Sequence, residues 1–228
     1  MSNILAIDTS NAYCSVALNC SGQTSARRSS EVRQHARQLL PMIQELLTER
    51  ALSVAELQAI AFVSGPGSFT GLRIGTGVVQ GLAFASDLPV VPVSSLAVMA
   101  ASALQEKACK RVFVALQARE DEIYGALYES VNGDVVLLGE EGVGPVSAFL
   151  SSLRALNVED CLAGDVETVL NAVQGTETLS PEVGEVRDCA SDAQMLSQLA
   201  ALRFAKGMAV EPMQAEPVYV KEQMDYRE

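Results

Sequence analysis

A glycine-rich segment in the first half of the chain constrains the fold more than any other feature of this sequence. Residues 65–75 read GPGSFTGLRIG and join two apolar stretches. The preceding stretch, residues 59–63, has the length and composition of a buried strand, and the following one, to about residue 85, has helical character. A strand, a glycine-rich turn and a helix in this order are typical of α/β proteins. The turn is also a candidate site, because free amides at the start of a helix can bind an anion.

The spacing of the glycines favours packing over phosphate binding. No Gly-Lys-Ser/Thr sequence ends the turn, and Gly65, Gly67 and Gly71 are one residue too widely spaced for a dinucleotide-binding loop. Ser68 is placed to cap the helix. Small residues continue along this helix at Gly71, Gly75, Gly77, Gly81 and Ala85. They would let another helix approach closely, so we expect an interaction helix, with Arg73 as its cation.

The rest of the chain continues the α/β pattern. Strands are expected at residues 4–8, 14–18, 23–28 and 89–93, and helices at residues 34–51 and 95–105. In the second half, strands are expected at residues 135–138 and 161–163 and a helix at residues 146–156, and Ser191 is expected to cap a helix that continues to residue 204. A second hairpin starts at Val112, and moving residues 4–18 forward by 109 positions places Asp8 on Gln117. This match indicates a weak internal repeat, and a chance similarity between two hairpins is the alternative.

Charge divides the chain into two parts. The 228 residues include 16 Lys/Arg and 28 Asp/Glu, a net charge of −12. Residues 1–110 have a net charge of +1 and residues 111–228 one of −13, which predicts a neutral N-terminal lobe and an acidic C-terminal lobe. Because a charge of −12 repels phosphate backbones, the chain alone is not expected to bind RNA. Its basic cluster of Arg27, Arg28, Arg33 and Arg37 fits either a solvated edge or a contact for an acidic or phosphate-bearing partner.

The histidine and cysteine content argues against a metal site. His35 is the single histidine, which leaves no pair for a zinc site, and a hydrogen-bonding role at a surface or interface is expected for it. The five cysteines are odd in number and include no C-x-x-C, which argues against a zinc ribbon and a disulfide framework. They are typical of a reducing cytosol, and no apolar stretch reaches the length of a membrane span. These observations predict a cytoplasmic protein.

Asp8 is a second candidate functional residue. It ends the first expected strand and opens a hydroxyl-rich turn, where a two-lobed phosphotransferase would hold magnesium and phosphate. An Asp at a strand end also caps its own turn, and this interpretation is the favoured one. With Gly65 and Gly67, Asp8 completes a candidate nucleotide-binding set. The aligned residue of the second half, Gln117, lacks the acid.

Several segments together resemble the bacterial TsaB family, formerly YeaZ. They are ILAIDTSN at residues 4–11, QHARQLLPMIQELL at 34–47, VSGPGSFTGLRIG at 63–75, and PVYVK at 217–221. The resemblance implies an actin-like (ASKHA, ribonuclease H-like) fold with two lobes of mixed sheet flanked by helices. It also implies a subunit without catalysis of its own.

The resemblance further implies a place in the machinery that installs threonylcarbamoyl on N6 of adenosine 37 in tRNAs reading codons that begin with A. TsaD is the catalytic paralogue, bound through the two helices of the first lobe, and the ATPase TsaE joins the assembly. ATP or ADP and metal would be held by these partners, and tRNA would be bound only through the complex. Where TsaD has two metal-binding histidines, this chain has Ser95 and Met99, which are poor ligands for such a metal. Many TsaB proteins have Asp where this chain has Gln117.

The expected partner-binding face combines the helices of residues 34–51 and 68–85. Its expected residues are Leu39, Ile43, Leu46, Ser68, Phe69, Thr70, Gly71, Leu72, Arg73, Gly75 and Gly81. In isolation the same face could pair with itself as a homodimer. Two other classes of function remain as alternatives, a metalloprotease-like peptidase and a small actin-like ATPase or kinase that uses Asp8 and the glycine-rich turn.

Overall fold

The computed structural model describes residues 2–29, 31–106, 109–119, 121–174, 185–187 and 189–220, which form two compact units. The first unit comprises Met1–Val98 and Ser191–Pro217, and the second comprises Met99–Ala190 and Val218–Glu228. The units therefore differ from the expected lobes of residues 1–110 and 111–228. The chain returns to the first unit at Ser191, and the helix that follows buries apolar side chains against the first sheet.

The first unit is built on a mixed five-stranded sheet of order β3-β2-β1-β4-β5. Its strands are β1 (Asn3–Asp8), β2 (Ser15–Cys20), β3 (Gln23–Arg28), β4 (Ala59–Gly65) and β5 (Val90–Ser94). β1 pairs antiparallel with β2 and parallel with β4, so β1 lies at the centre, and every residue of β4 is buried. The polar turns after β1 and β4 consequently lie at the same edge of the sheet, because parallel strands end together.

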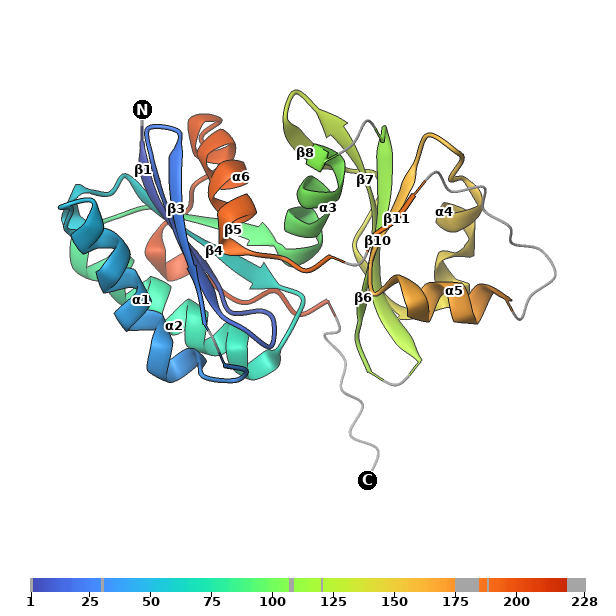
Figure 1. The fold of residues 1–228 in the computed structure, drawn as a ribbon, viewed down its shortest axis with the longest axis horizontal. Helices are drawn as coiled ribbons and strands as arrows, with labels where there is room; N and C mark the ends of the chain where they lie inside the picture. The colour runs from blue at the N-terminus through green and yellow to red at the C-terminus, as the bar shows by residue number, and fades with distance from the viewer. Residues whose placement is uncertain are drawn as a thin grey trace. The chain divides into compact units, whose positions relative to one another are not determined.

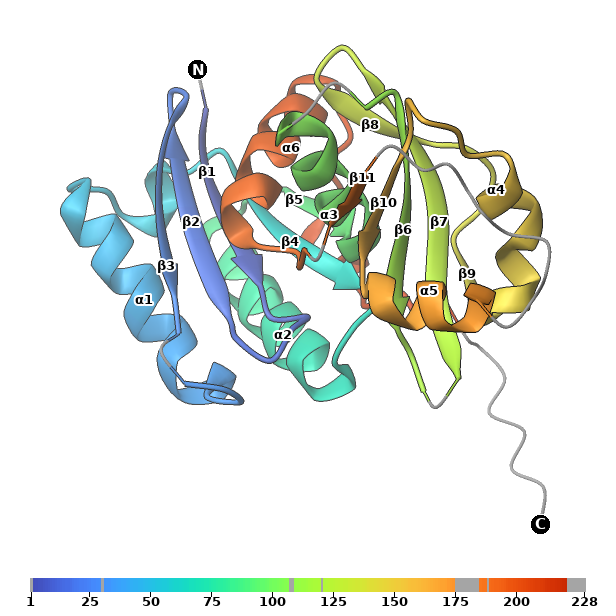
Figure 2. The same cartoon turned by 45° about the vertical axis from the view of Figure 1, so that its right-hand side comes forward.

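Helices cover both faces of this sheet (Figures 1 and 2). They are α1 (His35–Glu49) and α2 (Phe69–Ser86) on one face and α6 (Ala193–Ala205) on the other, with η1 (Val54–Glu56) and η3 (Pro212–Gln214) as short 3-10 turns. Between the sheet and α1 and α2 lies a core that includes Leu18, Leu46, Phe62 and Val79. The expected helix of residues 34–51 is confirmed, and it continues through Pro41.

The second unit repeats this topology with a six-stranded sheet. Its strands are β6 (Arg111–Gln117), β7 (Glu122–Val131), β8 (Asp134–Leu137), β9 (Gly142–Pro145), β10 (Cys161–Gly164) and β11 (Glu185–Arg187). Its further elements are η2 (Val146–Phe149), α4 (Leu150–Arg154) and α5 (Val166–Gln174), and the helix α3 (Ser95–Glu106) begins in the first unit and ends in the second. Phe113 and Phe149 meet edge to face in its core, with ring centroids 5.7 Å apart.

The internal repeat is present in the order and direction of the strands. The central path of the second sheet, β8-β7-β6-β10-β11, matches β3-β2-β1-β4-β5, with the same two antiparallel and two parallel pairings. The register differs by one residue, because Ala6 pairs with Ala17 whereas Ala115 pairs with Gly125 and not with Ala126. The two units therefore share a topology, although their sequences are similar at only a few positions.

The N-cap residue of α6 lies one position later in the sequence than expected. Asp192 is the N-cap, and its side chain accepts a hydrogen bond of 2.9 Å from the amide of Met195. The expected cap, Ser191, instead directs its hydroxyl group to Asp8. Among the described residues, no helix combines the length and apolar character needed to cross a bilayer.

Candidate functional site

The glycine-rich turn between β4 and α2 packs against the turn that follows β1. The amide of Ser68 donates a hydrogen bond of 2.8 Å to the carbonyl oxygen of Ser10. A Cβ atom on Gly67 would lie 2.6 Å from that carbonyl oxygen, and Gly67 has a φ of 155°, so this position requires glycine. The hydroxyl group of Ser68 caps α2 by accepting a hydrogen bond from the amide of Gly71. Two amides of the expected anion site are thus already bonded within the protein.

The glycines of α2 divide into two groups with different surroundings. A Cβ atom would lie 2.0 Å from the carbonyl oxygen of Thr9 at Gly71 and 2.2 Å from the Thr9 hydroxyl oxygen at Gly75. These two glycines let α2 approach Thr9 within the first unit. At Gly77 and Gly81, apart from the adjacent residues and the backbone of α2 itself, no atom of the described residues lies within 4 Å of the added Cβ. This part of the small-residue side remains open.

The apolar side chains expected to meet a partner face the core. Leu39, Ile43 and Leu46 of α1 are 1%, 3% and 0% exposed, and Leu72 of α2 is 2% exposed. Helical spacing identified the apolar face of α1 correctly, but that face covers β2 and β3. These four residues support the helices from within and do not form the outer surface.

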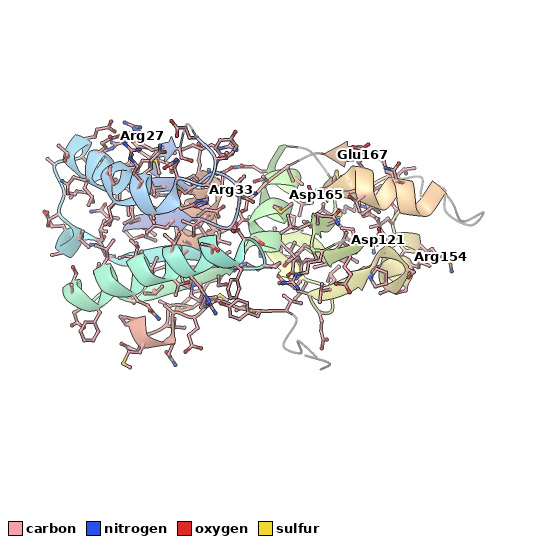
Figure 3. All side chains as sticks on the ribbon, turned by 90° about the horizontal axis from the view of Figure 1, so that it is seen from below. Arg27, Arg33, Asp121, Arg154, Asp165 and Glu167 are labelled. Atoms are coloured by element: carbon pink, nitrogen blue, oxygen red, sulfur yellow. A yellow bond between two sulfur atoms is a disulfide. The ribbon has the colours of Figure 1, made fainter. Side chains whose placement is uncertain are left out.

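The outer surface of α1 and α2 has a different set of residues, which we call the docking face. Its members are Leu40, Phe69, Thr70, Arg73, Gly77, Gly81 and Phe84. Phe84 is 74% exposed, and Phe69 is 53% exposed with the Arg73 guanidinium 3.8 Å from its ring centroid. The two helices lie side by side in the view of Figure 3. Of these residues, the sequence predicted Phe69, Thr70, Arg73 and Gly81 as partner-binding and Gly77 as part of the small-residue side of the helix, whereas Leu40 and Phe84 were not predicted.

Asp8 is fully buried in a hydrogen-bond network inside the first unit. Its Oδ1 accepts bonds from the amide and the hydroxyl group of Ser10, at 2.8 and 2.7 Å. Its Oδ2 accepts a bond of 2.6 Å from the hydroxyl group of Ser191. The side chain of Asn11 donates to the Ser191 carbonyl oxygen at 2.7 Å. The network therefore joins the turn after β1 to the segment that enters α6.

This environment fits the turn-capping interpretation of Asp8. Burial raises the pKa of Asp8 above its ordinary value, against the hydrogen bonds from Ser191 and Ser10, which lower it. Both carboxylate oxygens are bonded and the side chain is 0% exposed, so a nucleotide phosphate or its magnesium ion has no access to it in this structure. Gly65 is also buried. The three residues of the nucleotide-binding set thus lie near one edge of the sheet, with Asp8 and Gly65 buried.

The remaining candidates have partners within the protein. The Ser95 hydroxyl group donates a hydrogen bond of 2.6 Å to the carbonyl oxygen of Pro66. Met99, on the same helix α3, is 1% exposed. Gln117 is exposed, and its Oε1 accepts a bond of 2.8 Å from Thr168. His35 is buried, with its Nε2 2.9 Å from the carbonyl oxygen of Asn11, so it anchors α1 to the turn after β1. Within the described residues, no group of three or more His, Cys, Asp or Glu side chains could hold a metal ion.

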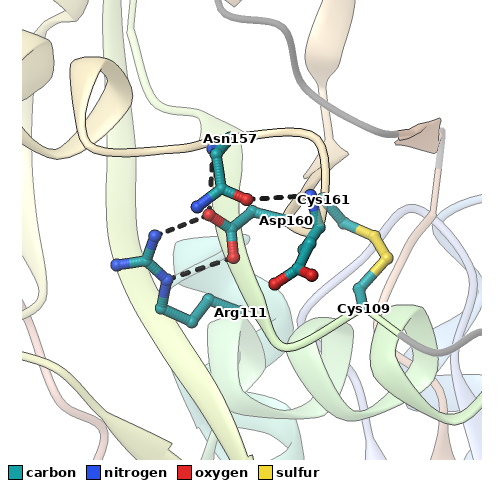
Figure 4. Close-up of a disulfide and its surroundings, with 6 residues drawn as sticks. Cys109, Arg111, Asn157, Asp160 and Cys161 are labelled. Atoms are coloured by element: carbon teal, nitrogen blue, oxygen red, sulfur yellow. Dashed lines mark hydrogen bonds and ion pairs between the residues drawn. A yellow bond between two sulfur atoms is a disulfide. The ribbon is translucent and has the colours of Figure 1, made fainter.

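A disulfide bond joins Cys109 and Cys161 in the second unit, which corrects the expectation drawn from the cysteine pattern (Figure 4). The two residues are 52 positions apart in sequence, but the parallel pairing of β6 and β10 sets Cys161 opposite Val112. Their Cα atoms are consequently 6.0 Å apart. Cysteine spacing could not show this proximity, because it arises from strand pairing.

An ion pair reinforces the same place. Arg111 donates two hydrogen bonds to the carboxylate of Asp160, at 3.1 and 2.6 Å. Burial alone would raise the pKa of Asp160, but the bonds from Arg111 and from the amide of Asn157 lower it below its ordinary value. The starts of β6 and β10 are therefore held together covalently and electrostatically.

The two units define the class of protein. Each unit has a mixed sheet flanked by helices. The strand order is β3-β2-β1-β4-β5 in the first sheet, and the corresponding order β8-β7-β6-β10-β11 is found in the second. Two such units in one chain define the actin-like fold. The structure of YeaZ from Pseudomonas aeruginosa is similar, with a TM-score of 0.84 and 38% identity over 96% of this chain and 100% of that one. A second structure, described as an uncharacterized protein with similarity to peptidase YEAZ from Pseudomonas aeruginosa, gives 0.82 and 37% over 97% and 100%.

Sequence comparison gives the particular family. The family model "TsaD: tRNA N6-adenosine threonylcarbamoyltransferase" matches residues 29–172. The tRNA threonylcarbamoyladenosine biosynthesis protein TsaB of Escherichia coli (strain K12) is 37% identical, over 98% of this chain and 96% of its own length. The TsaB protein of Haemophilus influenzae is 31% identical over 98% and 95%. The chain belongs to the TsaB family of tRNA threonylcarbamoyladenosine biosynthesis proteins.

Proposed function

We propose that this chain is a noncatalytic subunit that docks on TsaD through the docking face and enables threonylcarbamoylation of N6 of adenosine 37 in tRNAs reading codons that begin with A. TsaE would join the same assembly in the cytoplasm. The observation that carries this proposal is the exposed surface of α2, where two exposed phenylalanines, Phe69 and Phe84, lie on either side of two exposed glycines, Gly77 and Gly81.

The geometry of that surface suits a partner helix. Phe69 and Phe84 are separated by about 22 Å along the helix axis at 1.5 Å per residue. Gly77 and Gly81 lie between them, one turn apart, with open space at both Cβ positions. Without side chains there, a second helix can pack at the short end of the usual range of interaxial distances, about 8 Å. The exposed phenyl rings would then be buried in the contact, and aromatic residues are enriched in the buried cores of protein interfaces.

Two positions support the proposal that the chain has no catalytic role: Asp8, and the residues of α3 that correspond to metal ligands in TsaD. Asp8 is closed off by its hydrogen bonds, and α3 carries Ser95 and Met99 where the catalytic paralogue has metal-binding histidines. The chain would accordingly hold no cofactor of its own, with ATP or ADP and metal bound by TsaD and TsaE. In the absence of TsaD, a second copy of this chain could occupy the docking face as a homodimer.

Reconstitution tests this proposal. Purified TsaD, TsaE, the enzyme that makes the threonylcarbamoyl donor, and unmodified tRNA are incubated with and without this chain, and the modified nucleoside is measured by mass spectrometry. We expect modification only when both the chain and TsaD are present. Modification by the chain without TsaD, or full modification without the chain, would contradict the proposal. ATP hydrolysis or peptide cleavage by the isolated chain would favour the enzyme alternatives.

A further inference from the structure

We propose that an arginine patch on the first unit, formed by Arg28, Arg33 and Arg37 beside Tyr13, contacts the phosphate backbone of tRNA within the assembly. This inference rests on the proposed function, since the chain meets tRNA only as part of the complex. It gives a role to the basic cluster, which the docking face does not include.

Backbone contacts bring the three arginines to one place, the turn after β1. The amide of Ser29, next to Arg28, donates 2.8 Å to the carbonyl oxygen of Cys14. The amide of Arg33 donates 2.9 Å to the carbonyl oxygen of Ala12. The anchoring of His35 on Asn11 then sets the first turn of α1, and with it Arg37, beside the same turn. Residues 28 and 33 are thus held beside residues 12–14, and residue 37 follows in the first turn of the helix that His35 anchors to Asn11.

The charges of the patch are available to a ligand. Arg28, Arg33 and Arg37 are exposed, and no ion pair is formed by any of them within the described part of the chain. The neighbouring Arg27, by contrast, pairs with Glu45 and Glu49 of α1. The first turn of α1 contains no acidic residue, so the positive end of the helix dipole adds to the patch. Glu31 is the one acidic side chain within residues 28–37.

Two further features favour a phosphate-bearing strand as the ligand. Arg28 stacks over the ring of Tyr13, with its Cζ atom 4.6 Å from the centroid, so its guanidinium plane is preorganised. Arg33 has a φ of 58°, a conformation in which glycine or asparagine is usual, yet the sequence places a long cation there. Guanidinium groups match phosphate oxygens in bidentate geometry, and several together bind a backbone independently of sequence.

The patch is too small to overcome the charge of the whole chain. Three arginines within a net charge of −12 do not bind RNA alone, but they add to an RNA surface that the partner supplies. The contribution of the patch is therefore expected only in the assembled complex. Reversing the charge of the arginines should lower the affinity of the complex for tRNA and reduce the salt dependence of that affinity.

The experiment uses the complete complex with TsaD and fluorescently labelled tRNA. Affinity is measured over a range of salt concentrations for the wild type, Arg33→Glu, Arg37→Glu and the double variant. Arg154→Glu is the matched control, because Arg154 is an exposed arginine of α4 in the second unit (Figure 3). Co-purification with TsaD and circular dichroism report on assembly and folding for every variant.

We expect the double variant to assemble with TsaD but to bind tRNA about tenfold more weakly at low salt, with a slope of log K against log salt that is reduced by about one for each arginine lost. Affinities and slopes equal to those of Arg154→Glu would overturn the inference. Loss of TsaD binding in the Arg33 and Arg37 variants would also overturn it, because the patch would then be a protein contact. If the wild-type chain itself fails to bind TsaD, the proposed function fails, which is a separate result.

Discussion

Asp8 shows how burial changes the role of a single residue in this protein. Its position after β1 fits a metal-binding carboxylate, but the side chain is 0% exposed and serves the fold through Ser10 and Ser191. The hydrogen bonds to the carboxylate do not fully compensate for desolvation, because the pKa is raised. A charged Asp8 is therefore less favourable in the folded state than in the unfolded state.

This raised pKa predicts a pH dependence of stability. Between the unfolded and folded pKa values of Asp8, the folded state binds more protons, so the free energy of unfolding falls as pH rises through that window. Asp8→Asn removes the titration but keeps a similar shape. Urea unfolding from pH 4 upwards should show that the variant becomes more stable relative to the wild type as pH increases. A stability difference that is constant with pH, or that changes in the opposite direction, would contradict this account of Asp8.

Gly75 and Gly77 make a matched pair for testing the two sides of α2. At Gly75 an added Cβ would meet the Thr9 hydroxyl oxygen, so Gly75→Ala should lower the free energy of unfolding by about 1–3 kcal/mol. At Gly77 the Cβ meets nothing, so Gly77→Ala should raise it by about 0.5–1 kcal/mol through higher helix propensity. Thermal denaturation of both variants measures the contrast, and equal midpoints would show that α2 does not depend on its approach to Thr9.

The difference between Gly75 and Gly77 could not be predicted from the sequence. The sequence showed a run of small residues and the Ser68 cap, and the structure confirms the cap. It could not assign each glycine to the inner or outer side, because that depends on the position of Thr9, which comes from another part of the chain. For the same reason the apolar spacing of Leu39, Ile43 and Leu46 could not show whether these side chains face the core or a partner, and in the structure they are buried in the core.

At the scale of elements, β6 and β10 are joined at their starts by the Cys109–Cys161 disulfide. Closing a loop of 52 residues restricts the unfolded chain and contributes about 4 kcal/mol in the chain-entropy model. We expect a reducing agent to lower the thermal midpoint of the wild type, and the double variant Cys109→Ser/Cys161→Ser to show the lower midpoint without reductant.

Cys20→Ser is the control for this prediction, because Cys20 is a free cysteine of β2 in the first unit. This variant should keep both the wild-type midpoint and its response to reductant. A wild-type midpoint that does not change with reductant would show that the link contributes nothing to stability.

Most helices and strands were predicted from periodicity and turn residues, including α1, α2, β4, β5 and α3. The predicted helix at residues 146–156 is instead the 3-10 turn η2 followed by the short helix α4. No helix or strand was predicted for residues 166–174, where α5 lies. The disulfide was missed because it follows from the pairing of β6 with β10, which no local pattern specifies.

At the scale of the whole molecule, the two units of the structure differ in charge as the two expected lobes do, although their boundaries are different. The first unit carries eight Lys/Arg and nine Asp/Glu, whereas the second carries eight and nineteen. The docking face and the arginine patch both belong to the nearly neutral unit, where the charge of the chain opposes an RNA-bound partner least. The TsaD family model matches residues 29–172, a range that includes parts of both units.

The central claim is that the outer side of α2 binds TsaD, and one measurement tests it most directly. Isothermal titration calorimetry gives the affinity of TsaD for the wild type, for Gly81→Leu and for Ala205→Leu, which places a leucine at an exposed position of α6 on the other face of the sheet. We predict that Gly81→Leu weakens binding at least tenfold, about 1.4 kcal/mol, because the added side chain fills the space that a partner helix needs. Ala205→Leu should bind as the wild type does. Equal affinities for all three proteins would contradict the account.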